Sequence, residues 1–477
     1  MKSNQTLKIR DRKFSLKTLV ASVIIATITS TLLTSIYFVT FVHVDVFPST
    51  VTYTIETDGA GNYRAIRYDG NKFWESTNAS FTINSAISSG NHVFLKEGTF
   101  ELTNYISLKH GLIFEGTGEN TIIKQADGAN LDRVIRASLK TATSFGRYQI
   151  KNLVIDGNKA NQNAGNGYGI ESDTYSSVEG DYVTFENLII QDTYGIGIET
   201  SGNYHFFSNV HVRNVDSHGF ILKDYKASLI GCSSVRNGGH GFQLRGTGIH
   251  RLISCVGDGN GLSGIHVYGI KYADLRVEIS GGTYNSNGQH GILFEAASNN
   301  RVSGVLLEGN SNAVANSNDN IHFKSYGTKH SKNNIVEGNT LRGRGKVRYQ
   351  IYEADSNQDY NLVQGNEILD NGQTGKIQMQ GSNSKVKNNI GFVTENSGTA
   401  TIANNEYIAH GLEPSLDIGP TNSTVMVTSY TTVYDGVPVV VGSNYVNKTH
   451  IRINAYWTNN TAIADDTIQI WWSVTYP

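Results

Sequence analysis

Proline, cysteine and charge are all scarce in this chain of 477 residues. It has 5 prolines, 2 cysteines and 17% charged residues, against 50 glycines. Isoleucine, valine, phenylalanine and tyrosine nevertheless recur throughout, which excludes a disordered chain. Two cysteines without a neighbouring histidine pair argue against a metal site built on sulfur. Residues 100–390 contain no convincing apolar period of 3.6, so abundant glycine there is typical of a β-rich protein with many tight turns.

Charge is absent altogether from residues 18–42, an apolar run that follows a basic segment. Residues 1–17 carry a net charge of +5. Because helical residues rise about 1.5 Å each, the run can span a hydrocarbon core of about 30 Å. The sequence therefore predicts a cytoplasmic tail at 1–17, a transmembrane helix at 18–42, and a single-pass protein of the cell membrane whose C-terminal part is extracellular. A cleaved signal peptide is the alternative, although no clear small-x-small cleavage site follows the run.

The remainder of the chain is mildly acidic. A total of −2 leaves −7 for the residues beyond 17, which argues against nucleic acid as a partner, because nucleic acid needs a basic surface. Four glycosylation sequons fit an exported segment. They begin at Asn78, Asn422, Asn447 and Asn459.

Self-similarity is the strongest pattern in the middle of the chain. A glycine followed by an apolar residue recurs, with spacings of 22, 22 and 23 residues where it is most regular and 26 to 30 elsewhere. A short alternating strand and an asparagine precede several of these glycines. The pairs begin at Gly169, Gly197, Gly219, Gly241, Gly264 and Gly291, with weaker forms at Asn320, Gln350 and Lys376.

Each repeat therefore reads as strand, asparagine turn, glycine, strand and loop. Strands of about four residues cannot bury a face alone, so the repeats are expected to stack and pair in parallel, about 4.8 Å apart. Since parallel crossovers are right-handed, the sequence predicts an all-β fold with a right-handed parallel β-helix of about 11 coils at 80–393. Residues 43–79 are expected to hold a linker with entry strands, and 394–477 a small β-sandwich.

Residues 80–124 resemble the opening of the pectin-lyase-like β-helix proteins. In that family a short helix caps the open end of the barrel, a V-x-L-x-x-G-T-F strand-turn follows, and a G-x-G-x-x-T-x-I strand comes next. Here the matching segments are 81–88, 93–100 and 116–122. The resemblance covers about two-thirds of the chain, residues 80–393. It implies the fold rather than one activity, since this fold hosts many functions.

After residue 393 the repeat stops and a different all-β segment begins. Its S-G-T-A-T-I…H-G-L…P pattern resembles the small β-sandwich that follows β-helices in some phage tail and archaeal surface proteins. In such proteins the module often mediates trimerisation or glycan binding, so the resemblance implies a homotrimer. Trp471 and Trp472 are adjacent in an expected strand, so at least one of them must face the core.

Residues that recur at one position of the repeat are expected to form ladders. Cys232 and Cys255 occupy the same position in adjacent coils, and a buried pair of thiols is favoured over a disulfide because in-register neighbours direct their side chains poorly for that bond. The asparagines are expected to cap turns and bond along the stack. The histidines before the repeat glycines are interpreted as a structural corner. These ladders comprise Asn214, Asn237, Asn260, Asn287, Asn310 and Asn371, and His218, His240 and His290.

A histidine between two glycines also belongs to the signature of polygalacturonases, which share this fold. The resemblance would make His240 part of the G-H-G motif, with Asp192 and Asp216 as the acids. That family also needs N-T-D, D-D and R-I-K, where this chain has Asp-Thr at 192–193, a single carboxylate at Asp216, and Gly-Ile-Lys at 269–271. Since inverting hydrolysis needs an acid and a base on opposite sides of the bond, the incomplete signature puts a hydrolase with Asp192, Asp216 and His240 as catalytic residues in doubt.

An outward-facing patch is expected two and four residues after the repeat glycines. Its donors and its aromatic ring suit acidic or neutral glycans, while a solvated strand face is the alternative. A Ca²⁺ site would need acids clustered on successive coils, which the sequence does not show, and no cofactor is expected. The candidate substrate-binding residues are Lys223, Asp224, Gln243, Arg245, His266 and Tyr268.

Two functions remain open at this point. One is a membrane-anchored extracellular β-helix protein that binds a polysaccharide or surface glycan, or that builds a surface structure. The alternative is a polysaccharide lyase or glycoside hydrolase that acts on an acidic polysaccharide. A lyase needs a base that works near neutral pH and usually a cation that acidifies the proton α to the carboxylate.

Overall fold

The structure is a computed structural model. It describes residues 50–138, 147–163, 167–173, 182–269, 275–402, 406–409, 412, 423–429, 433–434, 437–447, 449–457 and 468–475.

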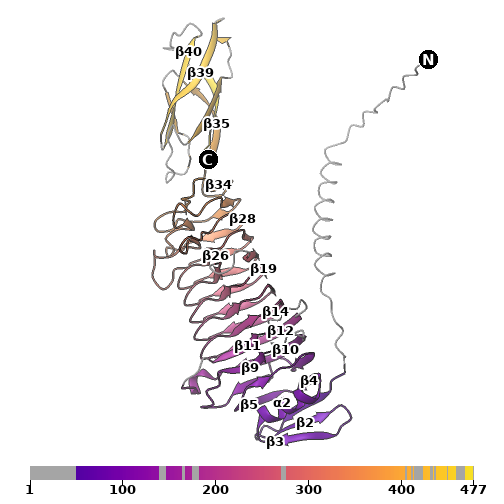
Figure 1. The fold of residues 1–477 in the computed structure, drawn as a ribbon. Coiled ribbons are helices and arrows are strands. Elements are labelled where there is room, and N and C mark those ends of the chain that lie inside the picture. The colour runs from indigo at the N-terminus through magenta and orange to yellow at the C-terminus, as the bar shows by residue number, and fades with distance from the viewer. Residues whose placement is uncertain are drawn as a thin grey trace, which may run out of the picture. The chain divides into compact units, whose positions relative to one another are not determined.

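Eleven short strands stack into one parallel sheet, called sheet B here, with one strand from each coil (Figure 1). Pairing is in register, so Phe220 lies beside Phe242 and Phe242 beside Ile265. From β13 on, each strand begins at the apolar residue of a predicted repeat pair, which confirms the repeat, and the eleven strands agree with the expected number of coils. They are β6 (Ile106–Ser107), β9 (Arg133–Ser138), β11 (Tyr168–Asp173), β13 (Ile198–Ser201), β15 (Phe220–Leu222), β18 (Phe242–Leu244), β21 (Ile265–Tyr268), β24 (Ile292–Glu295), β27 (Ile321–Lys324), β30 (Ile351–Glu353) and β33 (Ile377–Gln378).

The rest of each coil belongs to a second sheet of 23 strands, called sheet A. It contains two parallel ladders that meet at a bend. The first ladder and its entry strands are β1 (Tyr53–Thr57), β2 (Tyr63–Arg67), β3 (Lys72–Ser76), β4 (His92–Leu95), β7 (Leu112–Glu115), β10 (Arg147–Asp156), β12 (Tyr182–Gln191), β14 (Tyr204–Arg213), β16 (Lys226–Ile230), β19 (Gly248–Ile253), β22 (Leu275–Ser280), β25 (Arg301–Ser303), β28 (Ile335–Glu337), β31 (Leu362–Gln364) and β34 (Lys385–Lys387). The second ladder adds β5 (Gly98–Leu102), β8 (Thr121–Gln125), β17 (Ser233–Val235), β20 (Val256–Asp258), β23 (Thr283–Asn285), β26 (Leu306–Glu308), β29 (Thr340–Arg342) and β32 (Glu367–Ile368).

One residue per coil turns the chain at this bend. Asn152, Asn187 and Asn209 have φ of +58°, +51° and +52°, a left-handed conformation that asparagine tolerates. The side-chain amide of Asn187 donates to Asn152, and that of Asn209 to Asn187, both at 3.0 Å. Gly231 takes the same place in the next coil, with φ of +61°. Asparagine or glycine holds the bend in these four coils, and Ser254 holds it in the next, with φ of +52°.

The core lies inside the coils, where alternate residues of each strand meet. Phe220 and Phe242 stack with ring centroids 4.9 Å apart, and Phe294 and Phe323 at 5.2 Å. All four rings are fully buried in one continuous cluster. The alternation that buries these rings also turns the residues between them to the outer face of sheet B.

A single α-helix covers the first coil. Helix α2 (Ala79–Ser89) begins after Asn78, whose side chain accepts a hydrogen bond from the backbone N–H of Phe81. It buries Ile83, Ala86 and Ile87 in the core of the coils. The predicted cap at 81–88 is confirmed. A short 3-10 turn, η1 (Lys159–Asn161), lies between β10 and β11.

The asparagine ladder is also confirmed. Asn237, Asn260, Asn287 and Asn310 are buried, and each of the first three donates its side-chain amide to the next, at 2.9 to 3.0 Å. Their carbonyl oxygens also accept backbone N–H groups of the coil before. Asn214 and Asn371 differ from the prediction, because both are exposed. The ladder is met instead by the backbone N–H of Val215 and by the Asp370 carboxylate, which accepts the Gln350 amide.

Cys232 and Cys255 are buried free thiols, as the sequence predicted. Burial raises the pKa of the Cys232 thiol well above its ordinary value. The pair therefore packs as small apolar side chains in neighbouring coils.

Beyond β34 the described strands form two antiparallel sheets of three and four strands. Trp472 is buried in their common hydrophobic cluster and Trp471 is half-buried, so the core position of one tryptophan is confirmed. The β-sandwich and the homotrimer stay predictions. The strands are β35 (Glu395–Ile402), β36 (Glu406–Ala409), β37 (Thr424–Ser429), β38 (Val433–Tyr434), β39 (Val437–Val446), β40 (His450–Trp457) and β41 (Ile468–Thr475).

The predicted single-pass membrane localisation needs correction. No helix among the residues that the structure describes is long and apolar enough to cross a membrane. The tail at 1–17 and the expected span at 18–42 lie outside the described residues.

The two sequon asparagines that the structure describes accept hydrogen bonds from nearby backbone groups. Asn78 caps α2, and the Asn447 side chain accepts hydrogen bonds from the backbone N–H groups of Thr449 and His450 at 2.9 Å. Asn422 and Asn459 lie outside the described residues. Glycosylation at the four sites stays a prediction.

Candidate functional site

The outer face of sheet B carries a column of polar side chains along successive coils. Strand pairing places Gln243 beside His266, Leu293 beside His322, and His322 beside Tyr352. Tyr268 and Glu295 neighbour each other in a second column. The complete first column is Ser107, Arg136, Glu171, Glu199, Ile221, Gln243, His266, Leu293, His322, Tyr352 and Gln378.

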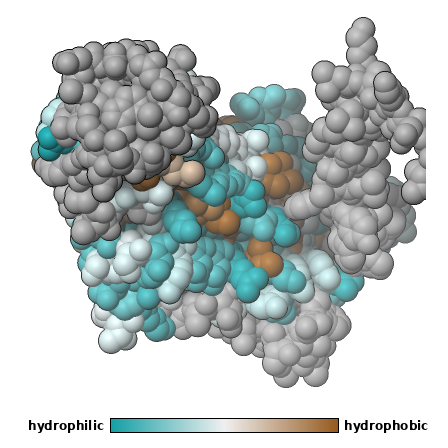
Figure 2. Space-filling view, turned by 90° about the horizontal axis from the view of Figure 1, so that it is seen from above, coloured by the Kyte–Doolittle hydropathy of each residue, from teal (hydrophilic) through white to brown (hydrophobic). Residues whose placement is uncertain are grey.

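The predicted binding patch lies on this face, with less exposure than expected. Lys223 is exposed and pairs with Glu199 at 2.5 Å. Arg245 stacks on Tyr268, 5.4 Å from its ring centroid. Gln243 and His266 point away from the core, but neighbouring side chains leave them only 4% and 5% exposed. The part of the surface that Figure 2 colours is mostly hydrophilic, with a few separate hydrophobic patches.

Asp224 does not belong to this patch, which corrects the prediction. The strand alternation continues for one residue beyond Lys223 and turns Asp224 into the barrel, where it is fully buried. Its carboxylate lies 2.8 Å from Nδ1 of His205 and accepts the Thr200 hydroxyl at 2.7 Å. Asp224 is therefore part of an interior polar cluster.

Asp192 and Asp216 are also used elsewhere. Asn214 donates to Asp192, and the Lys159 ammonium pairs with Asp216 at 2.9 Å. His240 instead stacks with His218 and His266 beside sheet B. The structure thus gives each of the three predicted catalytic residues its own partners and does not assemble them into one centre.

Imidazoles gather along the first column and the corner beside it. Ring centroids are 5.2 Å apart between His218 and His240, 4.5 Å between His240 and His266, and 4.3 Å between His290 and His322. The corner histidines cap the next coil: Nδ1 of His218 accepts the backbone N–H of His240, and Nδ1 of His240 accepts that of Ser263. His290 does the same for Asp319 at 3.0 Å.

These backbone bonds fix the protonation state of the corner rings. A ring nitrogen that accepts an N–H carries no proton, so the proton of the neutral ring sits on Nε2. Burial lowers the pKa of His218 to about 4 and holds the pKa of His240 and His290 well below the ordinary value. His218, His240 and His290 are therefore neutral donors at neutral pH. The interpretation of this position as a structural corner is confirmed.

His266 is held at both of its nitrogens. Nδ1 lies 3.1 Å from the Gln243 amide, and Nε2 lies 3.0 Å from the Glu295 carboxylate. Lys324 also pairs with Glu295, at 2.9 Å. The hydrogen bond from His266 is the main reason why the pKa of Glu295 falls to about 2, with Lys324 adding to it. Glu295 is therefore a permanent negative charge, which orients His266.

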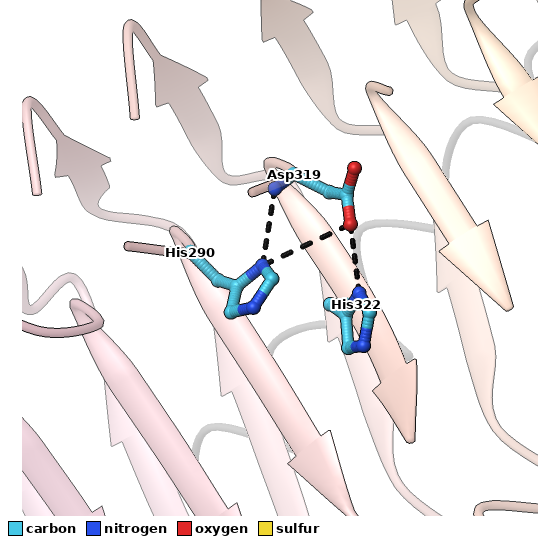
Figure 3. A group of neighbouring side chains, drawn as sticks. All are labelled: His290, Asp319 and His322. Atoms are coloured by element: carbon cyan, nitrogen blue, oxygen red, sulfur yellow. Dashed lines mark hydrogen bonds and ion pairs between the residues drawn. The ribbon is translucent and has the colours of Figure 1, made fainter. Parts of the chain in front are cut away.

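The second histidine–carboxylate pair is different because one imidazole nitrogen has no partner among the described contacts. Nδ1 of His322 lies 2.7 Å from Oδ2 of Asp319 (Figure 3). Arg348 grips the same carboxylate at both oxygens, at 3.1 and 2.8 Å. Burial works against the charge of Asp319, but the bonds from His322 and Arg348 outweigh it, and the pKa of Asp319 lies below its ordinary value.

The charged carboxylate sets the tautomer of His322. A carboxylate only accepts, so Nδ1 of His322 must donate, and the lone pair of the neutral ring lies on Nε2. Asp319 is fully buried, which keeps this orientation dry. His322 is therefore oriented as a base, in contrast to the donor rings of the corner. The neighbouring Tyr352, with its ring centroid 5.5 Å away, adds a hydroxyl beside it.

His290, Asp319 and His322 are close enough to be tested as a metal site. However, Nδ1 of His290 already accepts a backbone N–H, and Arg348 takes both oxygens of Asp319. A cation would have to displace these three contacts and to sit beside a guanidinium. The donor set fits a hydrogen-bonded base better than a metal ion.

The sequence interpretation missed His322, Asp319 and Arg348, although the repeat held a signal for two of them. Asn320-Ile321 is one of the weaker repeat pairs. His322 lies two residues after Asn320, just as Gln243 and His266 lie two residues after their repeat glycines. Asp319 directly precedes Asn320, as His240 precedes Gly241. Extending the same register two coils further would have named both. Arg348 comes from a loop, and the repeat does not predict it.

Comparisons with known proteins agree with this architecture. The family described as the right-handed β-helix region matches residues 140–305. The A-module of the mannuronan C-5 epimerase AlgE6 from Azotobacter vinelandii has a TM-score of 0.54 and 20% identity, covering 66% of this chain and 95% of that one. The A-module of AlgE4 from the same organism has a TM-score of 0.54 and 22% identity, covering 65% and 96%.

A phage structure is also similar. The Dettilon tailspike protein has a TM-score of 0.47 and 13% identity, covering 83% of this chain and 90% of that one. A comparison with curated proteins found no match.

The chain is thus a right-handed parallel β-helix protein. Its repeat, its helical cap and the family match over residues 140–305 agree with this fold and resemble the pectin-lyase-like β-helix proteins.

Proposed function

We propose that the chain removes the proton α to the carboxylate of a uronic-acid polysaccharide, as a lyase or an epimerase, on the outer face of sheet B. The observation that carries the proposal is His322, which Asp319 orients with a basic Nε2. A histidine base suits neutral pH, and a positioned base contributes about 10²- to 10⁴-fold to such a step.

Cations border this base on both sides. On one side Arg348 stacks over the Tyr352 ring at 4.1 Å. On the other side Lys324 pairs with Glu295 of β24, and Arg245 stacks on Tyr268 of β21. When the proton leaves for Nε2 of His322, its electron pair moves into the carboxylate as an enolate. Positive charge aimed at that carboxylate stabilises the developing charge.

Two outcomes follow from the same intermediate. In a lyase, the electron pair returns to expel the glycosidic oxygen at the neighbouring carbon, which leaves with a proton. In an epimerase, a proton returns to the carbon from its opposite face. Tyr352 is the neighbour of His322 in the column and carries a hydroxyl, so we assign it this proton.

The structural relatives support this class of chemistry. Two structures of the same fold carry the name mannuronan C-5 epimerase. Their likeness concerns the fold, and the acid–base role of His322 rests on the contacts within this chain.

The arrangement of carboxylates disfavours a hydrolase. Hydrolysis with inversion needs one carboxyl that stays protonated. On this face Glu171 pairs with Arg133, Glu199 with Lys223, Glu295 with Lys324, and Asp319 with Arg348. The pKa values of Glu295 and Asp319 lie below their ordinary values, so neither of these two carboxylates stays protonated as a general acid.

The test uses the full chain with polymannuronate, polygalacturonate and neutral dextran. We expect unsaturated products or C5-epimerised residues from a uronate polymer and none from dextran. His322→Gln should lower turnover by about 10²-fold or more, because the basic nitrogen is lost. The matched control is His211→Gln, since His211 bonds Ser233 and Asn209 on sheet A, away from this face. Equal turnover in the His322 variant and the wild type would refute the assignment.

The second candidate function is glycan binding without chemistry. The observation in its favour is that Glu295 and Asp319 are locked in ion pairs, as in a rigid binding surface. Measurable polysaccharide binding with no product from any uronate polymer would support this function over the enzyme.

A further inference from the structure

A row of tyrosines and cations lies at the start of the sheet A strands, away from the site. Strand pairing places Arg147, Tyr182, Tyr204 and Lys226 side by side in successive coils. Ile249 and Arg276 continue the same row. We call these six residues the tyrosine row.

The rings and cations of the row contact one another. Tyr182 and Tyr204 are stacked, with centroids 5.1 Å apart and planes at 12°. The Arg147 guanidinium lies 5.6 Å over the Tyr182 ring, and the Lys226 ammonium 5.1 Å from the Tyr204 ring. The cations thus cover the outer ring faces, so the row presents hydroxyls and N–H groups rather than bare aromatic faces.

The row faces solvent and is positive. Tyr182 is 42% exposed, and Tyr225, which packs on Tyr204, is 46% exposed. The six residues of the row include three cations and no acid. In the adjacent column Arg251 and Glu278 pair with each other at 2.7 Å, so they leave the charge of the row unchanged.

The row borders the proposed site along the chain. Strand β13 ends at Ser201 and β14 begins at Tyr204, while β15 ends at Leu222 and β16 begins at Lys226. Lys223, which is exposed at the end of the outer face, lies in the second of these turns. A chain bound on sheet B can therefore continue over the row.

We propose that the tyrosine row is a second binding site for an acidic polysaccharide chain, separate from the reacting centre. Carboxylates bind guanidinium and ammonium groups through charge-assisted hydrogen bonds, and tyrosine hydroxyls bond sugar hydroxyls. Strand spacing repeats these donors about every 4.8 Å, which suits an extended polymer rather than a single sugar. The choice of an acidic polysaccharide rests on the proposed function, while the site itself rests on the contacts of the row.

The test measures dissociation constants of the full chain for polygalacturonate and polymannuronate, with neutral dextran as the reference. Lys226→Glu combined with Arg276→Glu should weaken binding of a uronate polymer by about fivefold or more, the scale of one or two lost charge-assisted bonds. Tyr204→Ala should weaken it in the same direction. The matched control is Lys385→Glu, an exposed lysine on β34 of the same sheet, which should leave binding within about twofold.

Unchanged affinity in the row variants, or an equal loss in Lys385→Glu, would overturn the proposal. The two charge variants sit at the surface, so they keep the test decisive if Tyr204→Ala does not fold. Turnover separates the two proposals. If the wild-type chain shows no turnover but the row variants bind more weakly, this site is supported and the proposed function is refuted. If the chain shows turnover but the row variants bind as tightly as the wild type, only this second site is refuted.

Discussion

Histidines beside sheet B have three different roles in this molecule, and the hydrogen bonds of each ring determine its role. His240 accepts a backbone N–H and is a neutral donor, His266 is held at both nitrogens, and His322 donates to Asp319 and keeps a basic nitrogen. All three occupy similar places beside sheet B. A repeat position therefore fixes where a side chain lies, while its partners fix what it does.

A fourth role belongs to His250, inside the barrel. The ring is fully buried near Asp224, and among the described residues neither nitrogen is hydrogen-bonded to another side chain. Burial lowers the pKa of His250 to about 4, although the charge of Asp224 opposes this. The folded state therefore resists protonation while the unfolded chain takes up a proton near pH 6.5. The contribution of the neutral His250 to folding stability is therefore complete above pH 6.5 and is lost as the pH falls toward 4.

His250→Leu should remove part of this loss. We expect the denaturant midpoint of the wild type to fall more between pH 7 and 4.5 than that of the variant. The window also avoids Glu295, whose lowered pKa of about 2 means that its contribution is kept above about pH 4.5 and lost only below. The control is His110→Leu, at an exposed position. Identical pH dependence in the wild type and His250→Leu would contradict this account.

At the scale of elements, ladders connect each coil to the next. Asn287 accepts the backbone N–H of Asn260 at 3.1 Å and donates to the carbonyl of Gly257 at 3.0 Å, while fully buried. Asn287→Ala leaves both groups without a partner. Since each unsatisfied buried group costs about 1–3 kcal/mol, we expect a loss of about 3 kcal/mol in the free energy of unfolding. Chemical denaturation measures it.

Asn312→Ala is the matched control for this ladder. Asn312 lies near the same turn, where only its backbone N–H bonds to Asn287, and its side chain is exposed. It should change stability by less than about 0.5 kcal/mol. Similar losses in both variants would show that the ladder has no special role.

Elements of this kind are what the sequence predicts best. The spacing of Gly219, Gly241 and Gly264 predicted the strands of sheet B, because the period of a solenoid is written directly in the chain. The same register predicted that Gln243 and His266 leave the core. It also placed Asp224 outside, incorrectly, because one further step of the alternation returns the side chain to the interior.

At the scale of the whole molecule, the site was harder to predict than the fold. His322 and Asp319 come from β27 and the residue pair before it, and Arg348 comes from a loop almost one coil later. Their meeting depends on a loop between coils whose length varies, and the repeat does not encode that length. The polygalacturonase signature drew attention to His240 instead, which the structure assigns to backbone capping.

The outer face of sheet B runs along eleven strands and is mostly polar. His322 lies on this face, and the tyrosine row lies on the neighbouring strands of sheet A. A surface of this length suits a polymer rather than a small substrate. The central claim is that His322 breaks a carbon–hydrogen bond in such a polymer, and not merely that the face binds it.

Proton exchange tests this claim most directly. The full chain is incubated in D₂O with polymannuronate and with polygalacturonate, and the C5 proton of the uronate residues is followed by NMR. The account predicts that this signal disappears, through elimination or through deuterium incorporation, and that His322→Gln abolishes the change while His211→Gln keeps it. A C5 proton that persists in both polymers, with the wild-type chain bound to either of them, would contradict the account.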